Sequence, residues 1–228
     1  MNHSKKVLLV EGDSDKSFFE KICKKLYLDT SVQVAPPKDL GGSHNSKEGV
    51  FKRLDVLLKQ LADEQITHIA VVVDADYAEQ HGLGYQKTIE RVTALVAPFD
   101  FELEESESPQ NGLYFKHTDG FNDLGLWVMP DNQQEGMLED WIKSCIKDDE
   151  SALFHQASEA VNSLSEPKFK EHSISKAEVA TWLAWQKKPG HGLYAVLKDD
   201  LLDNTQPLFQ SMEQWLKAIY LPNNTPCH

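Results

Sequence analysis

The sequence contains no long hydrophobic run. Its apolar stretches are all much shorter than the roughly 20 residues that a membrane-spanning helix needs. Only four apolar residues, 7–10, separate the polar start of the chain from Glu11, which is too short for the apolar region of a signal peptide. We therefore expect a protein with no membrane segment that works in the cytoplasm.

Cysteine is scarce as well. Cys23, Cys145 and Cys227 are the three cysteines, and their wide spacing fits neither a zinc site nor a disulfide framework, as is typical of a reducing compartment. The sequence also lacks the Gly-x-x-x-x-Gly-Lys-[Ser/Thr] phosphate-binding loop. Any ATP-driven step would therefore need a separate ATPase partner.

Positive charge is in deficit. With 23 Lys and Arg against 36 Asp and Glu, the formal net charge is −13. Proteins that bind nucleic acid on their own usually carry a basic surface, so this balance argues against a free-standing nucleic-acid binder. It does not exclude a metal-dependent enzyme that uses the basic surface of a partner.

The sequence does contain two short apolar runs that end abruptly in carboxylates. Residues 7–10 lead into Glu11, and residues 71–73 lead into Asp74 and Asp76. Such runs are typical of strands buried on both faces of a parallel sheet, where ligands bind outside the carboxyl ends of the strands. If the two strands are neighbours, the carboxylates converge, and a divalent cation is the natural counter-charge for them.

Strands and helices alternate through the first two thirds of the chain. The apolar patterns predict strands at residues 6–10, 32–35, 68–73, 113–116 and 124–129. They predict helices from about residue 13, at 47–62, at 86–96, from 135, and at 151–164, 175–186 and 210–219. We therefore expect an α/β fold of three layers, with a mostly parallel sheet and helices on both faces. We assign residues 1–148 to this α/β domain and residues 149–228 to a helical C-terminal extension packed on it.

The two acidic segments resemble the Toprim domain of topoisomerases, primases and the OLD (overcoming lysogenization defect) nucleases. The match is a strand followed by Glu-Gly-x-x-Asp at residues 11–15, and a later strand ending in Asp-x-Asp at residues 74–76. Residues 126–132, 136–141 and 180–190 resemble a bacterial family of Toprim-like proteins of unknown function that is related to the OLD nucleases, and this resemblance covers nearly the whole chain. Toprim domains often have a glycine soon after Asp-x-Asp, whereas here the first is Gly82, so the backbone there is expected to differ.

The resemblance implies a Toprim-like fold with Mg²⁺ or Mn²⁺ as cofactor. It assigns Asp74 and Asp76 to the metal, and Glu11 to acid–base or metal work. The residues themselves agree, because side chains two apart on an extended strand lie on one side, with Ala75 turned away. Mg²⁺ needs only one or two carboxylates besides water and substrate phosphate.

Further carboxylates are weaker candidates for the same site. Asp15 and Asp13 could bind metal or, equally well, cap the first helix. Asp131, Glu135 and Glu139 form a second acidic group that could support a second metal or simply occupy the solvated first turn of a helix. Glu139 is the best of these, because its spacing from Glu135 keeps both on one helix face.

Other polar and aromatic residues receive structural interpretations. The histidines show no shared ligand spacing, and we assign none of them to a site. Trp182 and Trp185 are expected to pack in the core rather than stack on bases. Lys187, Lys188 and the glycine pair at residues 41–42 are expected to be ordinary surface rather than phosphate ligands.

These features support one main hypothesis and two alternatives. The main hypothesis is a Mg²⁺- or Mn²⁺-dependent phosphodiesterase that cleaves nucleic acid. The first alternative is a Toprim-fold interaction module that binds metal weakly or not at all and acts with a partner such as an ATPase. The second is phosphatase or phosphotransfer chemistry on a small molecule.

Overall fold

The chain folds around one six-stranded sheet. A computed structural model describes residues 4–36, 45–80 and 82–221. The strands lie in the order β2-β1-β3-β6-β5-β4. Their bounds are β1 Lys6–Leu9, β2 Ser31–Gln33, β3 His68–Asp74, β4 Phe101–Leu103, β5 Leu113–His117 and β6 Leu124–Met129. The strands β2, β1, β3 and β6 are parallel, whereas β5 and β4 pair in antiparallel fashion.

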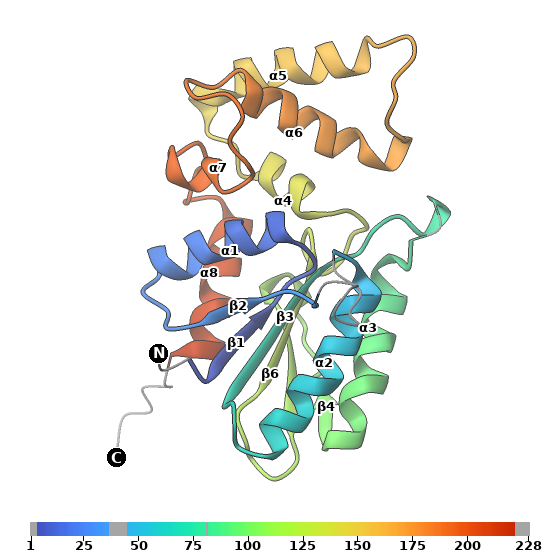
Figure 1. Ribbon diagram of the computed structural model, residues 1–228, viewed down its shortest axis with the longest axis vertical. Coiled ribbons are helices and arrows are strands. Elements are labelled where there is room, and N and C mark those ends of the chain that lie inside the picture. The colour runs from blue at the N-terminus through green and yellow to red at the C-terminus, as the bar shows by residue number, and fades with distance from the viewer. Residues whose placement is uncertain (1–3, 37–44, 81, 222–228) are drawn as a thin grey trace.

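Helices cover both faces of this sheet (Figure 1). Their bounds are α1 Asp13–Lys25, α2 Lys47–Ala62, α3 Gly84–Val96, α4 Leu138–Ser144, α5 Asp148–Asn162, α6 Ile174–Ala184, α7 Ala195–Lys198 and α8 Pro207–Tyr220. Helices α2 and α3 pack on one face, and α1 and α8 pack on the other. The expected three-layer α/β fold with a mostly parallel sheet and additional C-terminal helices is confirmed.

Both faces of the central strands are apolar because alternate residues point to opposite sides. Val71 and Val73 of β3 pack with α2 and α3, whereas Ala70 and Val72 pack with α1 and α8. Every residue of β6 is buried. Strands of this kind appear in a sequence as continuous apolar runs, which is why these two were recognisable.

Helix α8 lies very close to the sheet. It covers Gly125 of β6, where a Cβ atom would come within 2.8 Å of Ile219. The Tyr220 hydroxyl at the end of α8 donates a buried hydrogen bond to the Val7 carbonyl of β1 at 2.7 Å. The C-terminal segment therefore completes the cover of the sheet.

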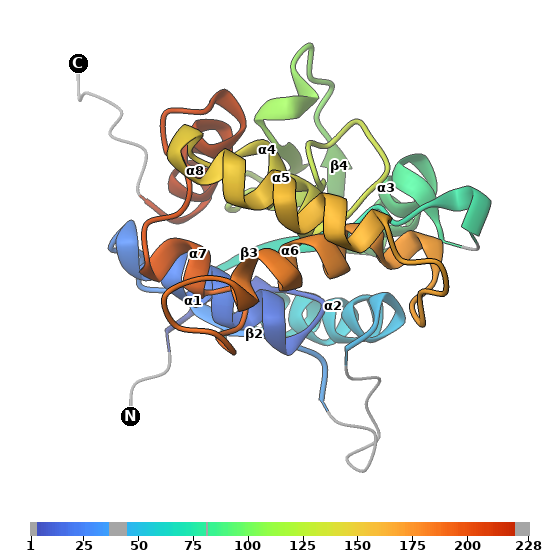
Figure 2. The same cartoon turned by 90° about the horizontal axis from the view of Figure 1, so that it is seen from above.

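The other C-terminal helices lie above the carboxyl ends of the parallel strands. Helices α5 and α6 pair there, with α4 between them and the sheet, as the side view and the view from above both show (Figures 1 and 2). Of the helices in the described ranges, none is both long and apolar enough to cross a membrane. The division into residues 1–148 and 149–228 stays a prediction, since α8 belongs to the cover of the sheet while α5, α6 and α7 lie above it.

Several predicted elements differ from the observed ones by one to three residues at their ends, and four differences have a clear physical reason or concern a whole element. The edge strand β2 is shifted toward the N-terminus relative to residues 32–35. The strand β4 and the helix α7 were not predicted, because three or four residues are too few to show a period. Helix α4 begins at Leu138 and not at residue 135, because Gly136 has φ 147° and its carbonyl accepts a hydrogen bond from the Asp76 N–H group at 2.9 Å.

Candidate functional site

The carboxyl ends of β1 and β3 meet, as expected for neighbouring parallel strands. The register pairs Leu9 with Val71, so the residues that follow them leave the sheet at the same edge. A cavity of about 260 Å³ opens there, with room for several water molecules at about 30 Å³ each. The charged residues that line it are Glu11, Asp13, Asp15, Asp74, Glu139 and Lys176. We call this cavity the acidic pocket.

The pocket contains four of the five carboxylates that the sequence singled out as site residues. Glu11 follows β1, Asp15 lies in the first turn of α1, Asp74 ends β3 and Glu139 lies in the first turn of α4. Only the tertiary structure brings these four elements together. Because like charges this close repel one another, the carboxylates resist ionising together.

Glu11 has a pKa well above the ordinary value of a glutamate side chain. Burial raises the pKa of Glu11, and the positive charge of Lys47 lowers it. The negative charges of Asp76 and Asp15 raise it again, and a backbone hydrogen bond from Asp74 lowers it. The resulting pKa is about 7. The Oε2 atom of Glu11 is buried and has no hydrogen-bond partner among the described residues. This oxygen can therefore exchange a proton with a ligand near neutral pH.

Burial is also the main cause that raises the pKa of Asp15, Asp74 and Glu139. For Asp74 the charges of the neighbouring carboxylates, Glu11 foremost, add to the effect of burial. Asp74 also accepts a hydrogen bond from the first N–H group of α4 at 3.0 Å. Asp15 accepts a hydrogen bond at 2.8 Å from the N–H group of Gly12, the N-cap residue of α1. Asp15 thus caps a helix and also faces the pocket, whereas metal binding by Asp15 stays a prediction.

Among the described residues that line the pocket, Lys176 on α6 supplies the positive charge. Burial lowers its pKa, but the attraction of the pocket carboxylates, Glu139 foremost, outweighs burial and the net shift is upward. Sequence reasoning missed this residue, because a single lysine on a helix has no distinguishing pattern. The only available signal was the need of the carboxylates for a counter-charge, which does not say where the charge comes from.

Asp76, the fifth carboxylate, does not line the acidic pocket. The strand β3 ends at Asp74 and Asp76 has a left-handed φ of 60°, so the expectation that both side chains lie on one side of an extended strand is wrong. Asp76 forms an ion pair at 2.5 Å with the nearly buried Lys47, a residue that sequence reasoning also missed. The chain then folds back on itself and brings Gly82 close to Asp76. A Cβ atom at Gly82 would lie 2.5 Å from the Cβ atom of Asp76.

The second acidic group is dispersed in the structure. Glu135 precedes α4 and accepts a hydrogen bond from the Ala78 N–H group at 3.1 Å, so the prediction that it shares a helix face with Glu139 is wrong. Asp131 accepts backbone hydrogen bonds within a turn. Of this group only Glu139 lines the acidic pocket. Asp13, the other weaker candidate, is exposed at the start of α1 and also lines the pocket.

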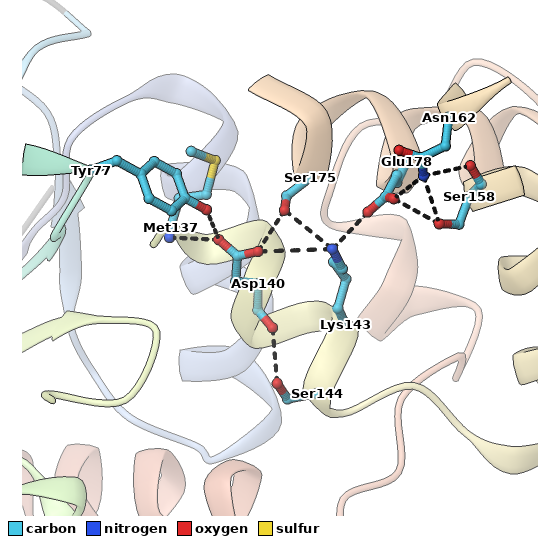
Figure 3. A network of polar contacts seen from close by, with 9 residues as sticks. All are labelled: Tyr77, Met137, Asp140, Lys143, Ser144, Ser158, Asn162, Ser175 and Glu178. Atoms are coloured by element: carbon cyan, nitrogen blue, oxygen red, sulfur yellow. Dashed lines mark hydrogen bonds and ion pairs between the residues drawn. The ribbon is translucent and has the colours of Figure 1, made fainter. Parts of the chain in front are cut away.

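A polar network holds α6, and with it Lys176, against α4 (Figure 3). Asp140 of α4 accepts hydrogen bonds from the Ser175 hydroxyl at 2.5 Å and from the Tyr77 hydroxyl at 3.0 Å. Burial and the charge of Asp140 raise the pKa of Tyr77 to about 12, so this hydroxyl stays a donor at physiological pH. Because Ser175 directly precedes Lys176, the network fixes where Lys176 enters the pocket.

Glu178 forms the other end of the network (Figure 3). Its residue is 4% exposed, and its carboxylate accepts hydrogen bonds from Lys143 at 2.6 Å, Ser158 at 2.7 Å and Asn162 at 3.0 Å. Burial raises the pKa of Glu178, but these hydrogen bonds outweigh burial and the net shift is downward. The network therefore joins α4, α5 and α6 into one unit.

The lining of the acidic pocket fits a magnesium or manganese ion. Its candidate ligands are carboxylate oxygens, which hard cations prefer, and Glu11 Oε2 is an acceptor that no described residue uses. In the described part of the chain, no three Asp, Glu, His or Cys side chains are placed to hold one ion directly. Mg²⁺ does not need such a set, because it usually keeps several waters and takes one or two carboxylates. A ligand role for Asp76 stays a prediction.

The remaining sequence expectations have simple outcomes. Trp182 is fully buried, as expected, whereas Trp185 is 45% exposed and lies outside the core. His172 lines a cavity next to the acidic pocket. His44, His81 and the glycine pair at residues 41–42 fall outside the described residues.

Comparison with known proteins gives one match. A family model described as "Protein of unknown function (DUF3226)" matches residues 5–221, which include the sheet and all the C-terminal helices described above. No curated protein and no solved structure matches the chain. The chemistry of the site therefore has to be inferred from its own residues.

The raised pKa of Glu11 makes the stability of the metal-free protein depend on pH. Between its ordinary pKa of 4.5 and its folded-state pKa of about 7, the unfolded state loses the proton first, so the free energy of unfolding falls as the pH rises. Glu11→Gln, which cannot ionise, should match the wild type at pH 4 and exceed its free energy of unfolding by about 1–3 kcal/mol at pH 8. Urea denaturation at both pH values measures this. Glu105→Gln, at an exposed site, is the control, and a Glu11→Gln protein less stable than wild type at pH 8 contradicts the assignment.

Removing Lys143 should leave Glu178 buried and without its cation. Lys143→Met should lower the free energy of unfolding at pH 7 by about 3 kcal/mol, because an unpaired buried charge is costly. Because the folded-state pKa of Glu178 lies below 4.5, this stabilisation exists above pH 4.5 and is lost as the pH falls, so the deficit should shrink at pH 3. Lys147→Met is the matched control: it breaks an ion pair with the exposed Asp200 and should cost less than about 1 kcal/mol. Equal losses in the two variants would show that Glu178 does not depend on Lys143.

Proposed function

Because the chain belongs to the DUF3226 family of proteins of unknown function, its site has to indicate its activity, and we propose a Mg²⁺- or Mn²⁺-dependent phosphodiesterase. The observation that carries this proposal is the acidic pocket, where carboxylates with raised pKa values surround a cavity and one buried carboxylate oxygen has no partner in the described chain. Perturbed titratable groups that share a cavity are typical of functional sites. The resemblance of the two strand-end motifs to Toprim domains and OLD nucleases supports the same chemistry.

Asp74, Glu139 and Asp15 are the residues that would hold the cation. Their burial disfavours the charged form, so each would gain from a cation that offsets its charge. The bound cation would neutralise part of the negative charge of the phosphate and would polarise a phosphate oxygen. Asp74 is placed centrally, because it interacts electrostatically with Glu11, Asp15 and Glu139 at once.

Glu11 is the candidate that moves the proton. A general base or acid works best when its pKa lies near the working pH, and the pKa of Glu11 is about 7. Its unpartnered Oε2 atom can accept a proton from an attacking water or return one to the leaving oxygen. This matches the role that the resemblance assigns to Glu11.

Lys176 is the candidate that binds the substrate phosphate. It lines the pocket from the side opposite the strands, on a helix held by the network of Figure 3. Lys176 is exposed as a residue, and an ammonium group can donate to an entering phosphate oxygen. A fixed cation at this place would stabilise the additional negative charge of the transition state.

We propose nucleic acid as the substrate class, on the strength of the resemblance to the OLD nucleases. With a net charge of −13, the chain would attract a polyanion only at this site, through the bound cation and Lys176. A partner with basic surface, such as an ATPase acting in trans, would supply the remaining affinity.

One observation favours the alternative of an interaction module. The ion pair of Lys47 with Asp76 neutralises a carboxylate that the resemblance assigns to the metal. If that pair persists, the site has one ligand fewer than the resemblance implies. A module of this kind would keep the fold and bind metal weakly or not at all.

Calorimetric titration with Mn²⁺ at pH 7.5 distinguishes the two readings. The wild type should bind Mn²⁺, and Asp74→Asn and Glu11→Gln should each weaken binding roughly tenfold or more, because each removes one charge from the pocket. Asp131→Asn removes a carboxylate of the nearby turn and should bind like the wild type. Absence of Mn²⁺ binding by the wild type would support the interaction module, as would the absence of Mn²⁺-dependent cleavage of DNA and RNA.

Lys176→Met should separate metal binding from substrate turnover. Because its positive charge opposes the cation, its removal should tighten Mn²⁺ binding several-fold, while kcat should fall by about 100-fold. Lys168→Met, at an exposed site, should change neither quantity. If Lys176→Met instead weakened Mn²⁺ binding, the lysine would be a structural support of the pocket rather than a substrate ligand.

A further inference from the structure

A second cavity, of about 220 Å³, adjoins the acidic pocket. It is lined by Asp76, Tyr77, Gln80, Gly82, Met137 and His172. Three segments contribute to both cavities: the end of β3 (Asp74 and Asp76), the start of α4 (Glu139 and Met137), and the region before and within α6 (His172 and Lys176). Residues 11–15 line only the acidic pocket, whereas Gln80 and Gly82 line only the second cavity. Two residues of chain span at most about 7 Å, so the cavities lie side by side. We call the second one the neutral pocket.

The neutral pocket differs from the acidic pocket in charge. Its one carboxylate, Asp76, is ion-paired with Lys47 at 2.5 Å. The hydroxyl of Tyr77 is already donated to Asp140 (Figure 3). Among the described residues of this lining, Asp76 is the carboxylate and it is already paired, so a second cation would find no unpaired carboxylate there. The pocket fits an uncharged part of a ligand whose phosphate lies in the acidic pocket.

Gln80 supplies a specific polar group to this pocket. Its Oε1 atom is buried and has no hydrogen-bond partner among the described residues. A buried acceptor is costly to leave unpaired, so a ligand that donates to it would gain affinity. A glutamine amide carries an acceptor and a donor side by side, and this arrangement matches the N6 amino group and N7 of adenine.

The other walls suit a flat ring. The Met137 side chain is nearly buried and apolar, and His172 presents an imidazole ring. Unpaired bases in protein sites commonly stack on aromatic rings, including histidine, while one polar side chain reads their edge. Sulfur of methionine also makes favourable contacts with aromatic rings.

We propose that the neutral pocket is a subsite for an adenine base, whose N6 amino group and N7 lie side by side, next to a phosphate in the acidic pocket. The inference rests on the proposed function of the acidic pocket and specifies its substrate class: a nucleotide unit, rather than a phosphate ester without a base. Gln80 reads the base edge, and Met137 and His172 contact its faces.

Calorimetric titration of the full chain with AMP, IMP and ribose 5-phosphate, each in the presence of Mg²⁺, tests this subsite. AMP should bind about tenfold more tightly than ribose 5-phosphate and than IMP, whose 6-oxo oxygen would face Gln80 Oε1 without a proton to donate. Gln80→Ala and His172→Ala should each reduce the preference for AMP, whereas Gln156→Ala, at an exposed site on α5, should keep it.

The outcomes separate this inference from the proposed function. Equal affinities for AMP, IMP and ribose 5-phosphate in the wild type would overturn the base subsite, whatever the state of the acidic pocket. A preference for AMP that persists in Gln80→Ala would overturn the role of Gln80. Failure of Mn²⁺ to bind, with the preference for AMP intact, would count against the phosphodiesterase and leave the base subsite standing.

Discussion

Glu11, Asp15, Asp74 and Glu139 line one cavity at the edge of the sheet, beside the exposed Asp13, and their mutual repulsion has to be balanced within the folded chain. Burial also disfavours the charged form of these four carboxylates and raises the pKa of each. Lys176 balances part of the charge, and protonation balances another part. A site arranged in this way is less stable than a neutral one of the same shape, and such arrangements are usually retained for binding or catalysis.

The topology explains why the site lies where it does. Parallel pairing of β1 with β3 sends Glu11 and Asp74 out of the sheet at one edge. The next parallel strand, β6, returns the chain to the same edge, from which it enters α4 with Glu139. Three neighbouring strands thus deliver acidic residues to one place, and a helix from the end of the chain brings the lysine. Ligands generally bind at the carboxyl ends of parallel strands. In this protein the same strand ends also gather the negative charge of the site.

The sequence predicted the elements with long apolar patterns and missed the short ones. The range of α2 and that of β6 were predicted to the residue, because each shows its own period or a continuous buried run. The carboxylates at the strand ends were recognisable because apolar runs stop at them. The left-handed backbone of Asp76 was not, since it depends on the bridge to Gly136, some sixty residues away. Lys47 and Lys176 were missed for the same reason: a lysine acquires its partner only when distant segments meet.

The position of α8 has a consequence for the order in which the chain can fold during synthesis. One face of the sheet, which includes Leu8 and Trp127, is covered by this helix, whose residues leave the ribosome after those of every strand. A nascent chain in which β6 is complete therefore still exposes an apolar surface that only residues 207–220 can close. Such surfaces are sites of aggregation and of chaperone binding. A ribosome that stalls before this helix would release a chain with its pocket residues present and its sheet open to misassociation.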